Sequence, residues 1–443
     1  MTMQTNAMTT DRFESPQHLG YLRRVAVASA AGATVEWYDF FLYAAASAVV
    51  FNRLFFPDLT PTAGLLASLS TYAVGFLARP LGAVIFGAMG DRIGRRQVLL
   101  WTMLLMGGGT FLIGCLPTYG AIGFLAPVLL VLLRLCQGFG LGGEYGGAVL
   151  LVAENAPRNR RGYYASMVQV GVPIGILLSS AMLTLFTSLP EDQFLSWGWR
   201  VPFLASALIV VPGLLIRFKM DETPYFQKVV DQDATTKAPL REVLSEYKRR
   251  TALIIGIRVS ESACLFLFAT FPAIYLKDIG ELANPKQTVF LGSTIGAVLL
   301  IGMLPVFARL SDRVGRRPVY IFGAALMGVL GVAFFALAGT GNPVLVIVAI
   351  IIAYIADAAM YGPQAAFLTE LFPTRIRYTG VSLGQQIGAV FGGALAPIIA
   401  VALLDIGVGF WPVSLYVLAI ATMTGLCAYW LPETVGADLA RLD

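Results

Sequence analysis

Long apolar stretches separated by short polar segments fill almost the whole sequence. An apolar stretch of about 18 or more residues can cross the ~30 Å hydrocarbon core of a membrane as a helix. These stretches are too long and too continuously apolar to be strands of a membrane barrel, and a helix satisfies its own backbone hydrogen bonds in lipid. The pattern predicts twelve spans, at residues 25–51, 64–88, 97–116, 122–153, 162–187, 199–217, 251–276, 287–308, 318–338, 343–370, 379–404 and 411–431.

The composition supports this prediction. Hydrophobic residues make up 57% of the 443 residues and charged residues 13%, whereas a soluble domain carries about 25% charged residues. So few charges cannot cover the surface of a soluble globule of this size. The composition therefore excludes an ordinary soluble enzyme, a disordered protein and a nucleic-acid-binding protein, and it favours an all-α integral membrane protein.

The basic residues are distributed unevenly between the two sides of the predicted membrane. Of the 31 Lys and Arg residues, 24 lie in segments on the side of the N-terminus, four lie on the opposite side and three lie inside spans. Cytoplasmic loops carry such an excess of Lys and Arg. We expect both termini to be cytoplasmic, in a bacterial inner membrane, and we expect no cleaved signal peptide because the polar first 24 residues contain no apolar core.

The chain is predicted to consist of two related halves. Asp91-Arg92 and Asp312-Arg313 follow the second and eighth spans, and Glu154 and Glu370 close the fourth and tenth. Two parallel six-helix repeats with a binding site between them are typical of secondary transporters. The predicted segments are a tail (1–24), an N-terminal half (25–217), a cytoplasmic linker (218–250) with a short helix at 239–250, a C-terminal half (251–431) and a second tail (432–443).

Several motifs carry a resemblance to a known family. The pattern Gly-x-x-x-Asp-Arg-x-Gly-Arg-Arg at Gly87–Arg96 resembles the signature loop of the major facilitator superfamily, as does Arg134-x-x-Gln137-Gly138. The segment Glu36–Phe40 resembles its metabolite:proton symporter family, whose members carry shikimate, 2-oxoglutarate, citrate, proline or betaine. Arg258-x-x-Glu261 is most similar to the shikimate branch. The resemblance implies the major facilitator fold and transport by alternating access.

The repeated loop motif has a physical interpretation as a cytoplasmic latch. Asp91 can accept hydrogen bonds from the N-terminus of a neighbouring helix, whose dipole favours an anion. Arg95 and Arg96 can pair with a carboxylate such as Glu154, so the latch would favour one of two packing states. The alternative is that these residues only anchor the topology. The second half offers the matching residues Asp312, Arg316 and Glu370.

Ionisable residues inside the spans are the strongest indication of function. Each costs about 2.5–3.5 kcal/mol at a helix centre, so they must face one another or a wet cavity. Five carboxylates stand against three arginines, and the only histidine, His18, lies in the N-terminal tail. A proton would therefore be carried by a carboxylate; fixed Arg–carboxylate pairs are the structural alternative. The candidate proton-coupling residues are Glu36, Asp39, Glu144, Glu261 and Asp357.

The three arginines inside spans point to the substrate. Arginine stays charged and presents a planar fork that matches a carboxylate. Arg134 is the first candidate for a carboxylate contact, followed by Arg79 and Arg258. Candidate hydrogen-bonding residues for hydroxyl or keto groups, each of which has helix packing as its alternative, are Tyr43, Gln137, Tyr145, Gln169, Tyr361 and Gln385.

These observations lead to a proton-coupled symporter of a small organic anion, such as a shikimate-like hydroxy acid or a dicarboxylate. A zwitterion carrier of the proline or betaine type and a facilitator without coupling remain open. An integral-membrane enzyme lacks support, because no metal-ligand cluster, nucleophile motif or catalytic domain is present. Gly138–Gly143 matches G-x-G-x-x-G, but inside an apolar helix it predicts close packing and no nucleotide site. We expect a monomer in the bilayer, with no metal and no cofactor other than the proton.

Overall fold

The computed structural model describes residues 15–439 except 233, 270, 273, 274, 277–281, 283 and 408. Within these residues all regular structure is helical. The fold is the predicted all-α membrane architecture. The outer parts of the two predicted tails, residues 1–14 and 440–443, and part of the predicted seventh span lie outside the described residues.

The N-terminal half contains six long helical segments. The first helix begins before the predicted start of its span, because the Ser15 side chain accepts a hydrogen bond from the His18 backbone N–H at 3.2 Å and Pro16 occupies the first turn. The segments are α2 (Pro16–Ala46) with a π-helical turn (Ser47–Phe51), α4 (Pro61–Ile93), α5 (Arg95–Cys115), α7 (Leu125–Ala153), α8 (Arg161–Thr187) and the pair α10 (Arg200–Ala205) and α11 (Ala207–Phe218).

The C-terminal half follows two short linker helices, α12 (Pro224–Asp231) and α13 (Pro239–Ser245). The second of these is the short helix expected at 239–250, and it ends before Lys248, where the next long helix begins. The long segments are α14 (Lys248–Ala269), α16 (Pro285–Val314), α17 (Arg316–Ala338), α18 (Pro343–Thr369), α19 (Arg377–Ala389) joined through a π-helical stretch (Val390–Leu395) to α20 (Ala396–Leu404), and α21 (Trp411–Trp430).

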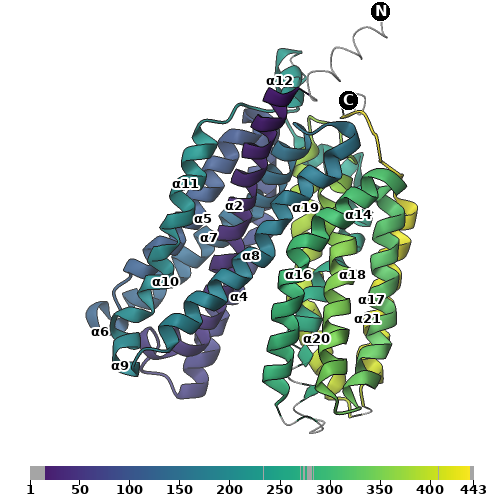
Figure 1. Cartoon of the computed structure of the whole chain (residues 1–443). Coiled ribbons are helices and arrows are strands. Elements are labelled where there is room, and N and C mark those ends of the chain that lie inside the picture. The colour runs from purple at the N-terminus through teal and green to yellow at the C-terminus, as the bar shows by residue number, and fades with distance from the viewer. Residues whose placement is uncertain are drawn as a thin grey trace, which may run out of the picture.

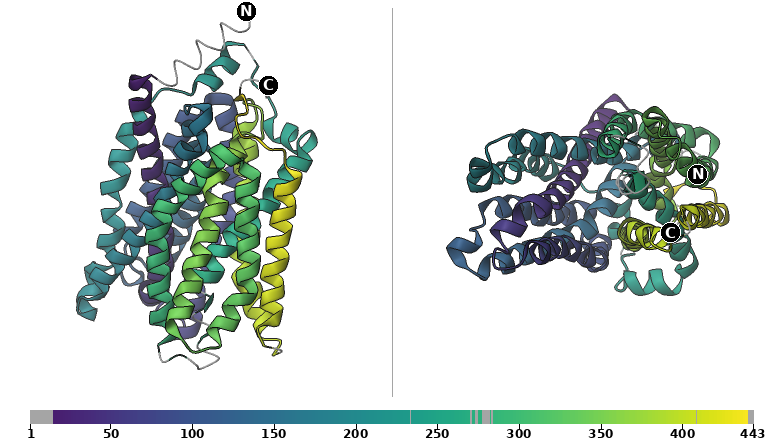
Figure 2. Two further views of the ribbon diagram at one scale, coloured as in Figure 1. Left: turned by 45° about the vertical axis from the view of Figure 1, so that its right-hand side comes forward. Right: turned by 90° about the horizontal axis from the view of Figure 1, so that it is seen from below.

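The two halves stand side by side as separate bundles, purple to teal and green to yellow (Figures 1 and 2). Helix α2 begins and α21 ends at the same end of the molecule, which we call the terminal face. The halves meet at this face and diverge towards the opposite end (Figure 1). Ten helical segments among the described residues are long and apolar enough to span a membrane. Helices α2 and α14 are not among them, and they carry Glu36, Asp39, Arg258 and Glu261.

The repeated motif turns at its second glycine. Gly94 and Gly315 have φ of 106° and 108°, a backbone conformation that favours glycine, and each ends a long helix just before the next one begins. Gly90, four residues earlier, does not serve this turn. Gly90 lies inside α4, where a Cβ atom would come within 1.8 Å of the Tyr378 ring, so this glycine allows close approach of the other half.

Glycines also set the spacing of helices within the N-terminal half. A Cβ atom on Gly138 would lie 2.1 Å from the carbonyl oxygen of Gly75, and one on Gly142 would lie 2.2 Å from that of Arg79. Helices α4 and α7 therefore pack backbone to backbone, as the G-x-G-x-x-G match in an apolar helix predicted. Gly171 in α8 approaches the Ala30 carbonyl of α2 in the same way. These contacts bring the charged residues of α2, α4 and α7 together.

Candidate functional site

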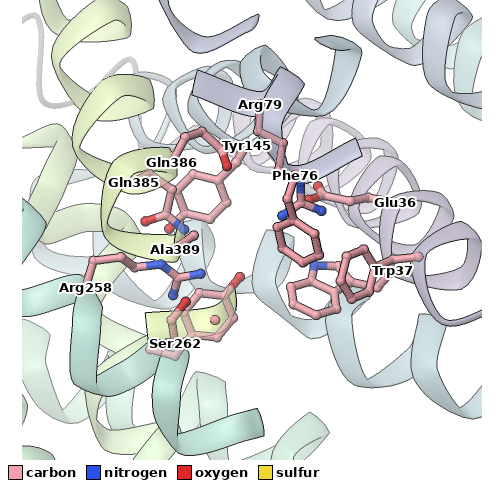
Figure 3. Close-up of a pocket in the computed structure, with 13 residues that line it drawn as sticks. Glu36, Trp37, Phe76, Arg79, Tyr145, Arg258, Ser262, Gln385, Gln386 and Ala389 are labelled. Atoms are coloured by element: carbon pink, nitrogen blue, oxygen red, sulfur yellow. The ribbon is translucent and has the colours of Figure 1, made fainter. Parts of the chain in front are cut away.

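A central cavity lies between the two halves and is constricted in this conformation to about 20 Å³ of water-accessible space. Figure 3 shows its lining. The N-terminal half contributes an acid, a base and four aromatic side chains, whereas the C-terminal half contributes mainly hydrogen-bonding groups. The lining residues are Glu36, Trp37, Phe40, Phe76, Arg79 and Tyr145 from the first half, and Arg258, Ser262, Tyr361, Gln385, Gln386, Ala389 and Gly393 from the second.

Arg79 of α4 is the principal cation of the N-terminal side of the cavity. Its side chain is 7% exposed, and its guanidinium lies over the rings of Phe40 and Phe76, 5.1 and 4.7 Å from their centroids. Cation–π contacts of this kind hold the side chain in place. Among the described residues no hydrogen bond or ion pair to Arg79 occurs. The guanidinium thus presents its donors to the cavity.

Glu36 of α2 lies beside Arg79, on the same side of the cavity. It is 6% exposed, and Figure 3 shows its carboxylate directed towards the Arg79 side chain. The two groups interact electrostatically but do not form an ion pair at 4.0 Å or less. Trp37 follows Glu36 on the helix and also lines the cavity. Sequence reasoning did not select Trp37, Phe40 or Phe76 as anion-site residues, since aromatic residues on an apolar helix give no signal of their own.

Arg258 of α14 occupies the C-terminal side. It forms an ion pair with Glu261, one turn further along the helix, and its Nη1 lies 3.4 Å from the Gln364 side-chain oxygen. With its amide oxygen towards Arg258, Gln385 accepts from Nε and Nη2, both at 3.2 Å. The Tyr361 ring lies 5.5 Å from the guanidinium. This cation is therefore largely neutralised and held in a fixed orientation.

Arg134, the first candidate for a substrate contact, does not line the cavity. Its Nη1 donates to Asp39 at 3.0 Å, and its guanidinium lies 4.2 Å from the centroid of the Tyr43 ring. Asp39 also accepts from Gln137 at 2.7 Å and from Thr110 at 2.8 Å. These residues form a closed, buried network inside the N-terminal half. Arg134 and Gln137, predicted as candidate substrate contacts, instead face α2 and α5 and lie outside the cavity.

Glu144 is also occupied by a partner within its own half. Arg217 of α11 donates to its carboxylate at 2.5 and 3.2 Å, and Thr102 donates at 2.7 Å. Arg217 is one of the 24 bases predicted to lie in segments on the side of the N-terminus, yet it is 1% exposed. That prediction is wrong for Arg217, so four arginines stand against the five carboxylates. Gly32 makes room for the pair, because a Cβ there would lie 2.2 Å from the Arg217 guanidinium.

Asp357 of α18 is, like Glu36, a buried acid without an ion pair among the described residues. It is 3% exposed, its Oδ1 has no hydrogen-bond partner, and no ion pair to it occurs among the described residues. It interacts electrostatically with Arg258 and Cys264 but does not line the cavity. Its carboxyl group lies within the C-terminal half, behind the cavity wall.

Two glutamines connect the halves between the cavity and the terminal face. Gln169 of α8 donates to the Tyr361 carbonyl oxygen of α18 at 2.6 Å, and its amide nitrogen lies 3.4 Å from the Tyr145 hydroxyl. Gln386 of α19 donates to the Leu141 carbonyl oxygen of α7 at 3.2 Å. Because Tyr145, Tyr361 and Gln386 line the cavity, these contacts hold the two halves together at the cavity.

The terminal face is closed by two equivalent helix caps. The Asp91 carboxylate accepts from the backbone N–H groups of Tyr378 and Thr379 at 3.0 and 2.8 Å, at the N-terminus of α19. Asp312 accepts from the N–H groups of Gly162 and Tyr163 at 2.8 and 2.9 Å, at the N-terminus of α8. In each case an acid of one half caps a helix of the other half, as the sequence predicted for Asp91.

Two buried charge clusters accompany the caps. Glu154 lies 2.8 Å from Arg377 and 3.5 Å from Arg95. Glu370 lies 2.8 Å from Arg161 and 3.1 Å from Arg316. Burial acts to raise the pKa of both carboxyls, but the paired guanidinium groups outweigh it and hold each pKa below its ordinary value. Each cluster therefore stays ionised and joins the two halves.

Arg96 does not take part in these clusters, contrary to the prediction. Its backbone N–H donates to Glu222 at 3.1 Å and its guanidinium donates to the carbonyl oxygens of Arg217 and Phe218, so that it ties α5 to the end of α11 within one half. Sequence reasoning also missed two arginines, Arg161 and Arg377. Their separation in the sequence equals that of Glu154 and Glu370, which is the signal that could have identified them.

Comparison with known proteins agrees with this architecture. Residues 32–374 and 262–441 match the family model described as Major Facilitator Superfamily. The chain is 41% identical over 434 residues to "Shikimate transporter" of Escherichia coli (strain K12), covering 96% of this chain and 98% of that protein. It is 39% identical over 437 residues to "Inner membrane metabolite transport protein YhjE" of the same strain, covering 98% and 99%.

More distant similarities extend the comparison. The chain is 32% identical over 434 residues to "Proline/betaine transporter" of Escherichia coli (strain K12), covering 95% of this chain and 85% of that protein. Among solved structures it is similar to the proton:xylose symporter XylE, with a TM-score of 0.74, 17% identity, and coverage of 96% of this chain and 99% of the other. At this identity the similarity establishes the fold.

Proposed function

This chain belongs to the major facilitator superfamily of membrane transporters, and we propose that it is a proton-coupled symporter of a small organic anion. The observation that carries the proposal is Arg79, a buried guanidinium that faces the cavity and has no hydrogen-bond partner among the described residues. A buried cation requires an anionic partner, and the planar fork of arginine suits a carboxylate.

The remaining lining supports a ring-bearing hydroxy acid. Trp37, Phe40 and Phe76 offer apolar faces beside Arg79, whereas Gln385, Gln386 and Ser262 offer hydrogen bonds across the cavity. In the proposed arrangement the substrate carboxylate binds Arg79, its ring contacts the aromatic side chains, and its hydroxyl or keto groups bind the C-terminal half. The 41% identity to a protein named as a shikimate transporter favours this class.

The proposed transport cycle alternates the access of this cavity. The halves 25–217 and 251–431 would rock about the central site, opening one end while the other closes. Asp91, Asp312 and the two charge clusters close the terminal face in the present conformation. The excess of basic residues supports a cytoplasmic terminal face in a bacterial inner membrane. We propose a monomer that needs no cofactor besides the proton.

Uptake into proteoliposomes tests the proposal. The purified protein would be assayed with labelled shikimate, 2-oxoglutarate and citrate, each with and without an inward proton gradient and with a protonophore control. We expect at least one carboxylate to be accumulated only under the gradient. Equal uptake with and without the gradient would show that the protein is a facilitator without proton coupling. No uptake of any carboxylate would contradict the proposal that the substrate is an organic anion.

A zwitterion carrier is the second candidate. A box of aromatic rings can hold a quaternary ammonium group, and Trp37, Phe40 and Phe76 line the cavity close to Glu36. The 32% identity to a protein named as a proline/betaine transporter supports this candidate. Labelled betaine in the same assay separates the two: gradient-driven uptake of betaine without uptake of carboxylates would favour the zwitterion carrier.

A further inference from the structure

We infer that Glu36 carries the coupling proton, because Glu36 and the carboxylate of the substrate share Arg79 as their only free counter-ion in the cavity among the described residues. This inference rests on the proposed function. It selects one residue from five buried acids, and the selection depends on where each carboxylate lies in the folded chain.

Three of the five acids are held by fixed partners. Asp39 accepts hydrogen bonds from three side chains, including Arg134 at 3.0 Å. Glu144 is bound by Arg217 and Thr102, and Glu261 forms an ion pair with Arg258. Protonating such a carboxylate would leave a buried guanidinium without a counter-ion, which is strongly unfavourable.

Asp357 has no fixed cation, but it lies behind the cavity wall. It does not line the cavity in this conformation, whereas Glu36 does. We therefore take Glu36, and not Asp357, as the acid that meets the substrate directly. Glu36 alone among the five acids lines the cavity, and it accepts no hydrogen bond from another described residue.

The charges that face Glu36 come from four neighbouring helices. Arg79 of α4, Arg258 of α14 and Glu144 of α7 lie within electrostatic reach of its carboxylate. The Tyr145 hydroxyl of α7 and the Tyr361 hydroxyl of α18 also lie within electrostatic reach. Since Glu144 and Arg258 are each paired with another side chain, Arg79 remains the free charge that determines the state of Glu36.

The coupling follows from the net charge of this pair. With Glu36 ionised, Glu36 and Arg79 together are neutral. A substrate carboxylate at Arg79 adds one negative charge beside two largely buried side chains, and uptake of one proton by Glu36 restores neutrality. Substrate and proton therefore favour each other's binding, and by linkage the effect is reciprocal. Above the pH at which Glu36 titrates, substrate affinity should fall by up to about tenfold per pH unit.

Glu36→Gln separates coupling from binding. The variant would be compared with wild type and with the matched control Glu191→Gln, an exposed acid paired with Arg53 outside the cavity. The probes are shikimate, 2-oxoglutarate and citrate in proteoliposomes. For Glu36→Gln we expect substrate exchange without a gradient to persist, gradient-driven accumulation to fall at least tenfold, and substrate affinity to become independent of pH. Accumulation driven by the gradient as in wild type would overturn the inference.

Glu36→Asp covers the case in which the glutamine variant does not fold. A shorter carboxylate keeps the titratable group and moves it away from Arg79, so accumulation should continue with a shifted pH midpoint. An unchanged pH profile would count against Glu36. Loss of coupling in Asp357→Asn, with coupling retained in Glu36→Gln, would assign the proton to Asp357.

Failure of this inference is distinguishable from failure of the proposed function. If wild type accumulates none of the three carboxylates under the gradient, the proposed function fails. If wild type accumulates one of them and Glu36→Gln does so equally well, the symport stands and only the assignment of the proton to Glu36 fails.

Discussion

Arg377 donates a hydrogen bond to Glu154 at 2.8 Å, although the two residues lie 223 positions apart and in different halves. The equivalent contact joins Arg161 to Glu370, also at 2.8 Å. Each half thus supplies an arginine to the carboxylate of the other half. The charges are fully paired only when the terminal face is closed, so separation of the halves must replace both contacts by water or by other partners.

Removal of one of these carboxylates should destabilise the closed state. Glu154→Gln removes the negative charge that neutralises the buried side chains of Arg377 and Arg95. Breaking a buried ion pair in this way lowers the free energy of unfolding by about 3–5 kcal/mol. Thermal unfolding in detergent measures the loss. Glu191→Gln, in an exposed pair with Arg53, is the control and should leave the midpoint nearly unchanged. Equal midpoints for both variants would contradict the assigned role.

The two charge clusters should stay ionised over a wide pH range. Because the pKa values of Glu154 and Glu370 lie below their ordinary value, the stability they contribute is complete above the ordinary carboxyl pKa of about 4.3. It is lost only as the pH falls through the lowered pKa of each folded-state group. The loss of thermal stability caused by Glu154→Gln should therefore be the same at pH 8 and pH 5. A much smaller loss at pH 5 than at pH 8 would contradict the lowered pKa of Glu154.

Asp91→Asn should insert normally but transport more slowly. The amide keeps the shape of the cap but loses the charge that favours the N-terminus of α19, an effect of up to about 2 kcal/mol in partly buried sites. Initial uptake rates in proteoliposomes measure it, and Asp312→Asn should behave alike because its cap is equivalent. Uptake kinetics identical to wild type would refute the latch.

The two arginines Arg79 and Arg134 should respond differently to the same conservative change. Arg79→Lys removes the planar fork from the cavity, and we expect substrate affinity to fall about tenfold or more. Arg134→Lys disturbs the buried network with Asp39, so it should lower thermal stability and change affinity much less. Binding titrations with the transported carboxylate measure the affinity of both variants. A larger loss of affinity in Arg134→Lys than in Arg79→Lys would indicate that Arg134, and not Arg79, binds the substrate.

Close packing of α4 on α7 should make Gly138 intolerant of a methyl group. In Gly138→Ala the new Cβ would meet the Gly75 carbonyl oxygen at 2.1 Å, and overpacking of this kind costs about 1–3 kcal/mol. Gly108→Ala is the matched control, since no heavy atom lies within 4 Å of its added Cβ. Thermal unfolding should show a loss for the first variant only, and equal stability of both would contradict the packing interpretation.

The sequence by itself determined the fold class and the repeat. Apolar stretches of membrane-spanning length, the two copies of the Asp-Arg-x-Gly-Arg-Arg motif and the paired acids at Glu154 and Glu370 depend only on local pattern. The cap formed by Asp91 could also be predicted, because a carboxylate is stabilised at the N-terminus of any helix, whichever part of the chain forms that helix. Such features can be predicted from the sequence because each involves only one helix or one short loop.

The tertiary structure decided which charges face the cavity. Helical spacing shows that Arg134 and Gln137 share one face, but it does not show which helix lies opposite, and here that face meets Asp39 and not the substrate space. Arg217 stands at the end of its span and resembled a loop base until α11 placed it against Glu144. The partner of a buried charge depends on the packing of helices distant in sequence, so only the folded chain separates Arg79 and Glu36 from the paired residues around them.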